Sequence, residues 1–279
     1  MSNAESGFVR LASGLRLRYR CAGEDGPTVL LLHGWPETGH AWRRVLPTLA
    51  ASGYVVVAPD LRGAGDSDKP TSGYDAGTRM EDVRGLAAAL GLAEEAVYVV
   101  GHGDAGAEAA SAYAADYPGE VAGLALLSAG PGLLRPLLGW VGEFHQTPDL
   151  PELLIAPQME AYLRHFFRAW SHDPDMLAET DLAVYVQALT KPGALRASLA
   201  PFRVPTPLPD APKVPTLLLL GESDPRLDLS RLPEDHAKLR VQTIPRGGHW
   251  LPEERPDPVA AALLTFFREQ EREAGNSLE

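Results

Sequence analysis

The chain has 279 residues, of which 45% are hydrophobic and 22% charged, so it is long and apolar enough to bury a large core. Its formal net charge of −12 argues against nucleic acid or an anionic membrane as a partner, because both need a basic surface. A single cysteine, Cys21, excludes an internal disulfide. No secretory leader or membrane-spanning run is visible, so we expect a cytoplasmic protein. The sequence does not distinguish a monomer from a homodimer.

The first predicted elements are two strands at 8–11 and 15–19, whose alternating residues indicate a hairpin around Ser13-Gly14. Continuous apolar runs then alternate with helical stretches. Such runs are typical of strands covered on both faces, so we predict an α/β fold with a doubly wound, mostly parallel sheet. Ligands of such a sheet bind at the carboxyl ends of its strands. The predicted strands are 28–32, 54–58, 97–100, 124–127 and 216–220, and the predicted helices are 40–50, 78–90 and 105–116.

The alternation of strands and helices stops after Ser128. From Pro131 to Pro209 the chain is helical, poor in strands and rich in aromatic residues, and the proline-rich stretch 204–209 cannot continue a helix. We interpret 131–209 as a helical cap inserted over the site, and 5–130 with 210–275 as the core domain. The alternative is a mere surface extension, but so many aromatic side chains require another surface to cover.

Two loops follow the first two long strands. His33-Gly34-Trp35-Pro36 can turn the Trp35 backbone N–H toward an oxygen that develops negative charge, with Ala105 as the second donor. The Trp35 indole would also wall the pocket, and the alternative is a proline-containing loop without function. The second loop, 60–68, packs charged residues between glycines, and we interpret it as a tightly hydrogen-bonded structural loop.

The strand at 97–100 ends in Gly101-His102-Gly103-Asp104-Ala105-Gly106, and a helical stretch follows at once. This is the context of a nucleophile elbow, a sharp turn that exposes one side chain above the sheet. We interpret Asp104 as the nucleophile, because Gly106 supplies the small residue expected two positions later. A carboxylate in that place attacks carbon and forms an alkyl ester, which suits an epoxide or a carbon–halogen bond.

A second frame for the elbow stays open, because His102 stands where a small residue is expected two positions before Asp104. In the frame that starts at Gly101, Gly103 occupies the nucleophile position and no nucleophile exists. A one-residue bulge before the turn would reconcile the two frames. A further alternative is that Asp104 caps the helix or supports other site residues.

An acid and a histidine follow the last two strands. Asp224 comes after the strand 216–220, and His249 comes after the next expected strand, which runs from Val241 to Ile244. The order nucleophile, acid, base is the one that this scaffold requires, so His249 would activate water and Asp224 would orient its imidazole. Glu222 is the second candidate for the acid.

Together, His33 to Pro36, the loop 60–70, the elbow, Gly221 to Asp224 and Gly247 to Trp250 resemble the α/β-hydrolase superfamily over almost the whole chain. The segments 60–70, 144–146 and 191–198 are most similar to its epoxide hydrolase branch. The resemblance implies an α/β-hydrolase core with a helical cap and no metal or cofactor. His33 and Trp250, which belong to these motifs, are further candidates for binding the substrate.

Epoxide hydrolases use cap tyrosines, in some cases with a histidine, to donate hydrogen bonds to the epoxide oxygen. By this resemblance the donors would fall at Phe202 and near Val141, and neither side chain carries a donor. Substitutes are expected among Tyr185, His145 and Tyr162. Related dehalogenases carry a halide-binding tryptophan or arginine after the nucleophile, where this chain has Ala105.

Two functions remain from these residues. The first is a cofactor-independent hydrolase that opens an epoxide of a partly apolar small molecule through Asp104, Asp224 and His249. The second is a hydrolase-fold protein that has lost this reaction and serves a cyclisation, a lyase step or binding. Asp104 with an intact acid–base pair favours the first, and His102 with Phe202 favours the second.

Overall fold

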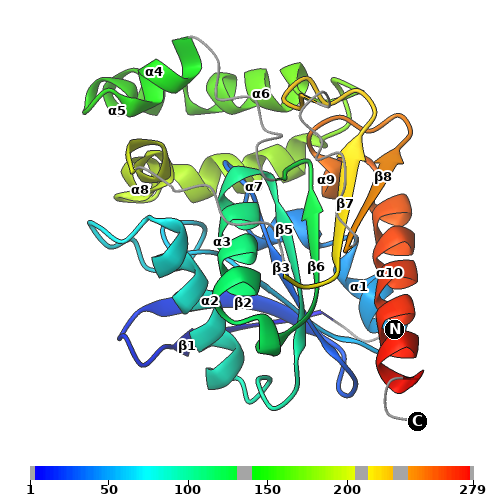
Figure 1. Ribbon diagram of the computed structural model, residues 1–279. Coiled ribbons are helices and arrows are strands. Elements are labelled where there is room, and N and C mark those ends of the chain that lie inside the picture. The colour runs from blue at the N-terminus through cyan, green and yellow to red at the C-terminus, as the bar shows by residue number, and fades with distance from the viewer. Residues whose placement is uncertain (1–3, 131–139, 205–212, 229–237, 277–279) are drawn as a thin grey trace.

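The computed structural model describes residues 4–130, 140–204, 213–228 and 238–276 (Figure 1). One sheet has the strand order β1-β2-β4-β3-β5-β6-β7-β8. Strands β1 and β2 pair antiparallel and β2 pairs antiparallel with β4, whereas the pairs from β4 through β3 to β8 are parallel. The predicted mostly parallel, doubly wound sheet is therefore confirmed. The strands are β1 (Glu5–Arg10), β2 (Arg16–Ala22), β3 (Thr28–Leu32), β4 (Val55–Pro59), β5 (Val97–His102), β6 (Val121–Leu127), β7 (Thr216–Gly221) and β8 (Leu239–Ile244).

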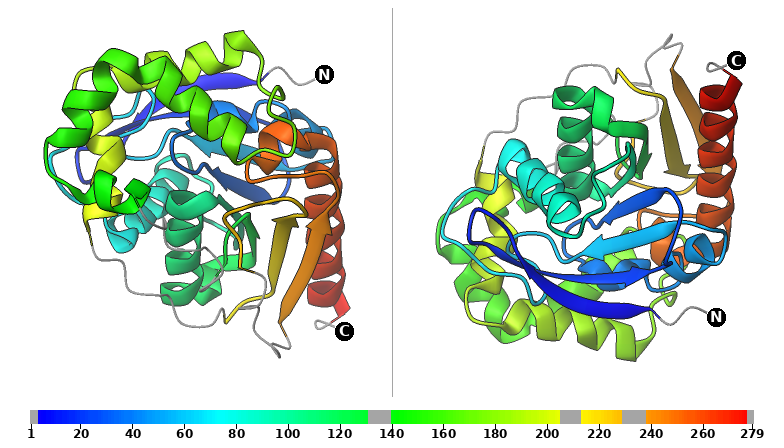
Figure 2. Two further views of the ribbon diagram at one scale, coloured as in Figure 1. Left: turned by 90° about the horizontal axis from the view of Figure 1, so that it is seen from above. Right: turned by 90° about the horizontal axis from the view of Figure 1, so that it is seen from below.

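Helices cover both faces of the sheet, because successive residues of each central strand point to opposite sides. In β3, Leu30 and Leu32 pack in one apolar cluster with α2 and α3, and Val29 and Leu31 pack in another with α1 and α10. All four side chains are fully buried. In the views along the sheet, α10 lies beside β8 at one edge and β1 runs along the other (Figure 2). The core helices are η1 (Gly39–Trp42), α1 (Leu46–Ala50), α2 (Ala76–Ala89), α3 (Gly103–Asp116), η2 (Pro118–Glu120), α9 (Leu251–Glu254) and α10 (Pro256–Asn276).

The helices that follow β6 and precede β7 along the chain form a layer over the upper ends of the strands in Figure 1. We call α4 to α8 the cap helices. Their apolar residues form a third cluster that includes Trp35 and Trp250 of the core loops. The expected boundaries of the cap, Pro131 and Pro209, lie outside the described residues, so the division into core and cap stays a prediction. The elements are α4 (Trp140–Gln146), α5 (Leu150–Ile155), η3 (Ala156–Gln158), α6 (Met159–Ala169), α7 (Glu179–Thr190), α8 (Ala194–Leu199) and η4 (Ala200–Arg203).

The described ranges contain no helix that is both long and apolar enough to cross a membrane.

Candidate active site

The turn between β5 and α3 places Gly103 at its apex. Helix α3 begins at Gly103, whose φ of +58° is left-handed and is the conformation that glycine adopts most readily. A Cβ at position 103 would lie 3.6 Å from Nε2 of His249 and 3.4 Å from Cα of Gly34. Position 103 is therefore the one that faces the predicted base.

Close backbone packing fixes the frame of this turn. A Cβ on Gly101 would lie 2.5 Å from the carbonyl oxygen of Gly106, and a Cβ on Gly106 would lie 2.4 Å from that of Leu32. Strand β5 pairs with β6 in register up to His102, and its one register shift lies at Val97/Tyr98, far from the turn. The bulge that would have brought Asp104 to the apex is thus not next to the turn.

The carboxylate of Asp104 is bound by Arg226. Nη2 of Arg226 lies 3.0 Å from Oδ2 and 3.3 Å from Oδ1 of Asp104. This geometry differs from the predicted one, in which Asp104 points to His249. The physical reason is that α3 begins one residue before Asp104, so the first turn of the helix carries the Asp104 side chain past the apex. Among the described residues, the Asp104 carboxylate accepts no hydrogen bond from a helix N–H, so it does not cap α3 through its side chain.

The predicted acid and histidine are hydrogen-bonded. Nδ1 of His249 lies 2.9 Å from Oδ2 of Asp224, and the two side chains are 1% and 0% exposed. The His249 backbone is fixed on both sides, because its N–H donates to the carbonyl of Trp170 at 2.7 Å and its carbonyl accepts from Nε2 of His102 at 2.8 Å. The alternative acid, Glu222, instead accepts from the backbone N–H of Arg246 at 3.0 Å.

The electrostatics of this pair suit a base. Burial lowers the pKa of His249 and outweighs the opposing charge of Asp224. Burial opposes ionisation of Asp224, but the hydrogen bonds from His249 and from the Arg226 backbone, with the charge of Arg226, hold its pKa below the usual value. At neutral pH His249 is therefore uncharged. Its Nδ1–H donates to Asp224, and among the described residues no group is hydrogen-bonded to Nε2 on the side of Gly103.

A second buried pair lies beneath the apex. Nδ1 of His102 lies 2.7 Å from Oε2 of Glu37, and both side chains are 0% exposed. Burial alone would lower the pKa of His102, but the charge and hydrogen bond of Glu37 raise it. Charged His102 can donate from both ring nitrogens, to Glu37 and to the carbonyl of His249, so this pair positions the base from behind.

The turn after β3 forms one wall of the site. Nε2 of His33 accepts from the Leu61 N–H at 3.0 Å and Nδ1 bonds the Gly34 carbonyl at 2.9 Å, so this imidazole joins two loops. The indole N–H of Trp35 donates to Oγ of Ser198 on α8 at 2.8 Å. Trp35 and Ala105 both line the cavity, and Ala105 belongs to the first turn of α3, where backbone N–H groups lack intrahelical acceptors.

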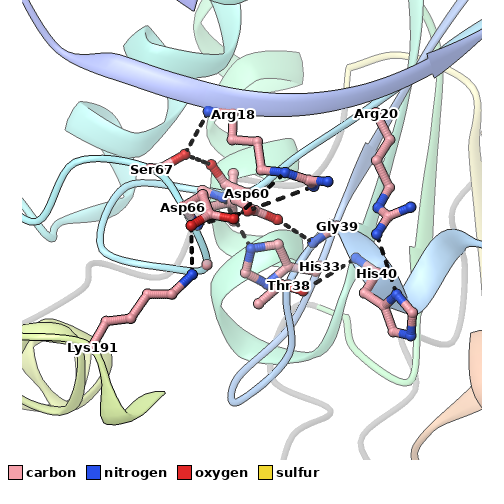
Figure 3. A network of polar contacts seen from close by, with 12 residues as sticks. Arg18, Arg20, His33, Thr38, Gly39, His40, Asp60, Asp66, Ser67 and Lys191 are labelled. Atoms are coloured by element: carbon pink, nitrogen blue, oxygen red, sulfur yellow. Dashed lines mark hydrogen bonds and ion pairs between the residues drawn. The ribbon is translucent and has the colours of Figure 1, made fainter. Parts of the chain in front are cut away.

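The loop 60–68 is tightly hydrogen-bonded, as we predicted. Buried Asp60 accepts from the backbone N–H of Gly39 and of Asp66, each at 2.9 Å, and its carbonyl accepts from Ser67 at 2.6 Å (Figure 3). Arg18 from β2 completes the cluster with an ion pair to Asp60 at 3.8 Å. These carboxylate oxygens are used by the loop itself, so the loop holds the site in shape.

A cavity of about 500 Å³ lies between the core loops and the cap helices. Its wall contains His33, Trp35, Ala105 and Phe202 of the predicted residues. It also contains Asp104, the predicted nucleophile, and five charged side chains that sequence reasoning did not select. The charged residues of the lining are Glu37, Arg62, Arg79, Asp104, Glu108 and Arg226.

Of the predicted residues, Asp224 and His249 do not belong to the lining of this cavity, and Tyr185, Trp250 and His145 lie behind its wall, as far as the described residues show. The hydroxyl of Tyr185 donates to Oε1 of Glu253 at 2.5 Å, because Glu253 is buried and needs donors. Trp250 stacks on Trp170 at 5.6 Å between ring centroids. Nε2 of His145 is hydrogen-bonded to the Tyr162 hydroxyl, and burial lowers its pKa to about 4.

The functional residues that sequence reasoning missed are Arg226 and Glu37, and Gly103 was weighed only as the alternative frame. The signal for Gly103 was Gly101, which stands two positions before it. Arg226 is 122 residues from Asp104 in sequence, so no local pattern links them. Among the described residues, no group of three or more His, Cys, Asp or Glu side chains is arranged to hold a metal ion.

The comparisons with known proteins agree with this fold. Residues 29–262 match the model of the Alpha/beta hydrolase family. The chain is 32% identical to the soluble epoxide hydrolase of Corynebacterium sp. (strain C12), over 96% of this chain and 99% of that protein. It is also 32% identical to epoxide hydrolase 4 of Mus musculus, over 95% of this chain and 80% of that protein.

Two solved structures are similar over nearly the whole chain. Wild-type Cfl2 from Burkholderia cenocepacia is 35% identical, with a TM-score of 0.84 and 94% and 95% of the two chains covered. Epoxide hydrolase CorEH without ligand is 31% identical, with a TM-score of 0.84 and 96% and 99% covered. The chain therefore belongs to the alpha/beta hydrolase family, and it is a hydrolase of the epoxide hydrolase-like kind.

Proposed function

We propose that this chain hydrolyses an epoxide on a small, partly apolar molecule by direct attack of water, without an ester on Asp104. The observation that carries the proposal is the approach of Gly103 to Nε2 of His249. Because Gly103 has no side chain, no nucleophile stands between Nε2 of His249 and the proposed position of the reacting carbon. The carboxylate of Asp104 is held in an ion pair with Arg226. Membership of the family supports epoxide hydrolysis as the reaction. The geometry of the elbow supports direct attack of water in place of an ester intermediate.

In the proposed step, Nε2 of His249 takes a proton from a water molecule while the water oxygen forms a bond to one epoxide carbon. The bond between that carbon and the ring oxygen breaks, and the ring oxygen leaves with the electron pair. It then receives the proton from the His249 imidazolium through solvent, so the product is a vicinal diol. Asp224 stabilises the imidazolium, as a buried carboxylate does in a catalytic triad.

The cavity supports a substrate with an apolar part. Trp35, Phe202 and Leu189 contribute apolar wall, and the volume of about 500 Å³ is in the range of small-molecule sites. The N–H groups of Trp35 and of Asp104, the residue directly after the apex, are proposed to hold the attacking water near Gly103. A cytoplasmic location fits the single cysteine.

Two other routes are tested by the same experiment. In the ester route Asp104 attacks carbon first, and in the non-hydrolytic candidate the chain has no diol product at all. The non-hydrolytic candidate is favoured by Phe202, which lines the cavity and occupies the position at which the resemblance to epoxide hydrolases implies a hydroxyl donor.

The test is a single turnover of styrene oxide in H₂¹⁸O with the enzyme in excess. Direct attack puts ¹⁸O into the diol in the first turnover and leaves Asp104 unlabelled. The ester route gives an unlabelled first diol, because its oxygen comes from the carboxylate, and labels Asp104 on hydrolysis. An absence of diol across aryl and alkyl epoxides would favour the non-hydrolytic candidate.

A further inference from the structure

Arg226 stands between the acid of the relay and the first turn of α3. It follows Asp224 by two residues, its side chain is only 7% exposed, and it belongs to the cavity wall. A buried guanidinium is rare in a cavity unless something there needs a cation. The question is which group that cation serves.

Three contacts hold Arg226 in one orientation. Its backbone N–H donates to Oδ1 of Asp224 at 2.8 Å. Its guanidinium lies over the ring of Trp170, 4.6 Å from the centroid, and its Nη2 binds Asp104. The side chain is therefore positioned before any ligand arrives, which lowers the entropy lost on binding.

Part of the guanidinium is unused. Within the described ranges, Nε and Nη1 of Arg226 make no hydrogen bond, although a guanidinium has five N–H donors. The other arginines of the wall differ: Arg62 makes two bonds to Asp82, and Nη1 of Arg79 is sealed away from solvent. Among the three arginines that line the cavity, Arg226 therefore combines a fixed position with N–H donors that, within the described residues, are neither hydrogen-bonded nor fully buried.

On the cap side of the cavity, the described lining residues Gln146 and Ser198 offer only uncharged donors. Phe202 has no donor, and the hydroxyl of Tyr162 is bonded to His145 behind the wall. An oxygen that gains negative charge near His249 would find its strongest donor in Arg226.

We propose that Arg226 binds a negatively charged oxygen of the substrate. This rests on the proposed function in one respect: the oxygen is either the epoxide oxygen as the ring opens or a carboxylate that the substrate already carries. Asp104 fixes Arg226 and opposes a second anion by its own charge. Asp104 would then be a positioning residue for Arg226.

The first arm of the test measures binding by calorimetry to the full-length protein, with phenylacetate and its neutral isostere phenylacetamide. If the substrate carries a carboxylate, the wild type prefers phenylacetate by about tenfold, because a charge-assisted hydrogen bond is stronger than a neutral one. Arg226→Gln should abolish the preference without weakening phenylacetamide. Asp104→Asn should strengthen phenylacetate, since it removes a like charge.

The second arm measures styrene oxide turnover. If Arg226 serves the opening ring, Arg226→Gln lowers kcat by about 100-fold with little change in KM, and Arg226→Lys recovers part of the loss. Guanidinium ion added to Arg226→Gly should restore activity. Melting curves and near-ultraviolet circular dichroism of Arg226→Lys and Arg226→Gln exclude misfolding as the cause.

The outcomes separate this inference from the proposed function. If the wild type makes no diol but prefers phenylacetate through Arg226, the anion site is supported and the proposed hydrolysis is contradicted. A wild type that makes diol, with neither the preference nor kcat sensitive to Arg226, keeps hydrolysis and overturns the anion site. A wild type with neither diol nor preference overturns both.

Discussion

The Cβ position of Gly103 lies 3.6 Å from Nε2 of His249, so the base of the relay faces a residue without a side chain. The contacts that a Cβ would make there are ordinary van der Waals distances, so a longer side chain has room to begin. This relationship makes position 103 the most informative place to change.

Gly103→Asp should create the ester route. The new carboxylate would stand beside His249, and the diol of the first turnover in H₂¹⁸O should become unlabelled. Because φ at this position is +58°, the substitution is expected to cost about 1–3 kcal/mol of stability. Gly103→Asn is the matched control, since it carries the same strain without a nucleophile. A labelled first diol from Gly103→Asp would contradict the assignment of the apex.

Asp104→Asn should retain turnover within about tenfold if the carboxylate is not the nucleophile, because Arg226 keeps its contact with the Trp170 ring and its backbone bond to Asp224 when the ion pair is lost. The measurement is kcat/KM on the same epoxide. A complete loss with an unchanged melting temperature would instead identify Asp104 as the nucleophile.

His249→Ala should abolish turnover, since no other described group faces Gly103 as a base. Under the direct route the variant accumulates no covalent adduct, and intact-protein mass spectrometry should show the unmodified mass after incubation with substrate. An adduct on His249→Ala would mean that a carboxylate of the protein is alkylated by the epoxide without help from the base.

Asp224→Asn should lower kcat by about 10⁴-fold while leaving the fold intact.

The pH profile of kcat/KM should reflect a histidine that burial keeps neutral. Since the pKa of His249 is lowered, kcat/KM should be flat above about pH 7 and should fall only below the ordinary histidine value of about 6.5. A midpoint above pH 7 would contradict this environment for His249.

His145 should make the protein less stable in acid. Its pKa is about 4 in the folded state and about 6.5 when unfolded, so the unfolded state binds more protons between these values and stability falls as pH falls. From pH 7.5 to pH 5 the loss amounts to about 2 kcal/mol. Urea unfolding of wild type and His145→Gln at both pH values checks it: the variant should lose less. Equal losses would show that His145 is not buried as a neutral group.

Much of the fold could be predicted because buried parallel strands are continuous apolar runs, and β3, β5, β6 and β7 lie where such runs occur. The start of α3 was the decisive difference. The helical pattern predicted a start at 105, but Gly103 takes the left-handed apex and the helix begins there. Gly101, a small residue two positions before Gly103, predicts the apex at Gly103. The carboxylate of Asp104 favoured the other frame because it is the residue type that can act as a nucleophile.

The rest of the site depends on contacts between distant segments. The bond from His249 to Asp224 followed from strand order, because both residues come after neighbouring strands. The partner of Tyr185 is Glu253, and that of Asp104 is Arg226, and neither pairing leaves a trace in local sequence. Which hydroxyl or guanidinium reaches a cavity is decided by packing.

The hydrogen bond from the His249 N–H to the carbonyl of Trp170 has a consequence for how ligands enter. It ties the loop of the base to the end of α6, and the Trp170 ring also stacks on Trp250. If all cap helices swung away as one lid, this tie would break and the base would lose its alignment at each opening. Entry is therefore expected at the opposite end, near α4 and η4, with the Trp170 side acting as the fixed hinge.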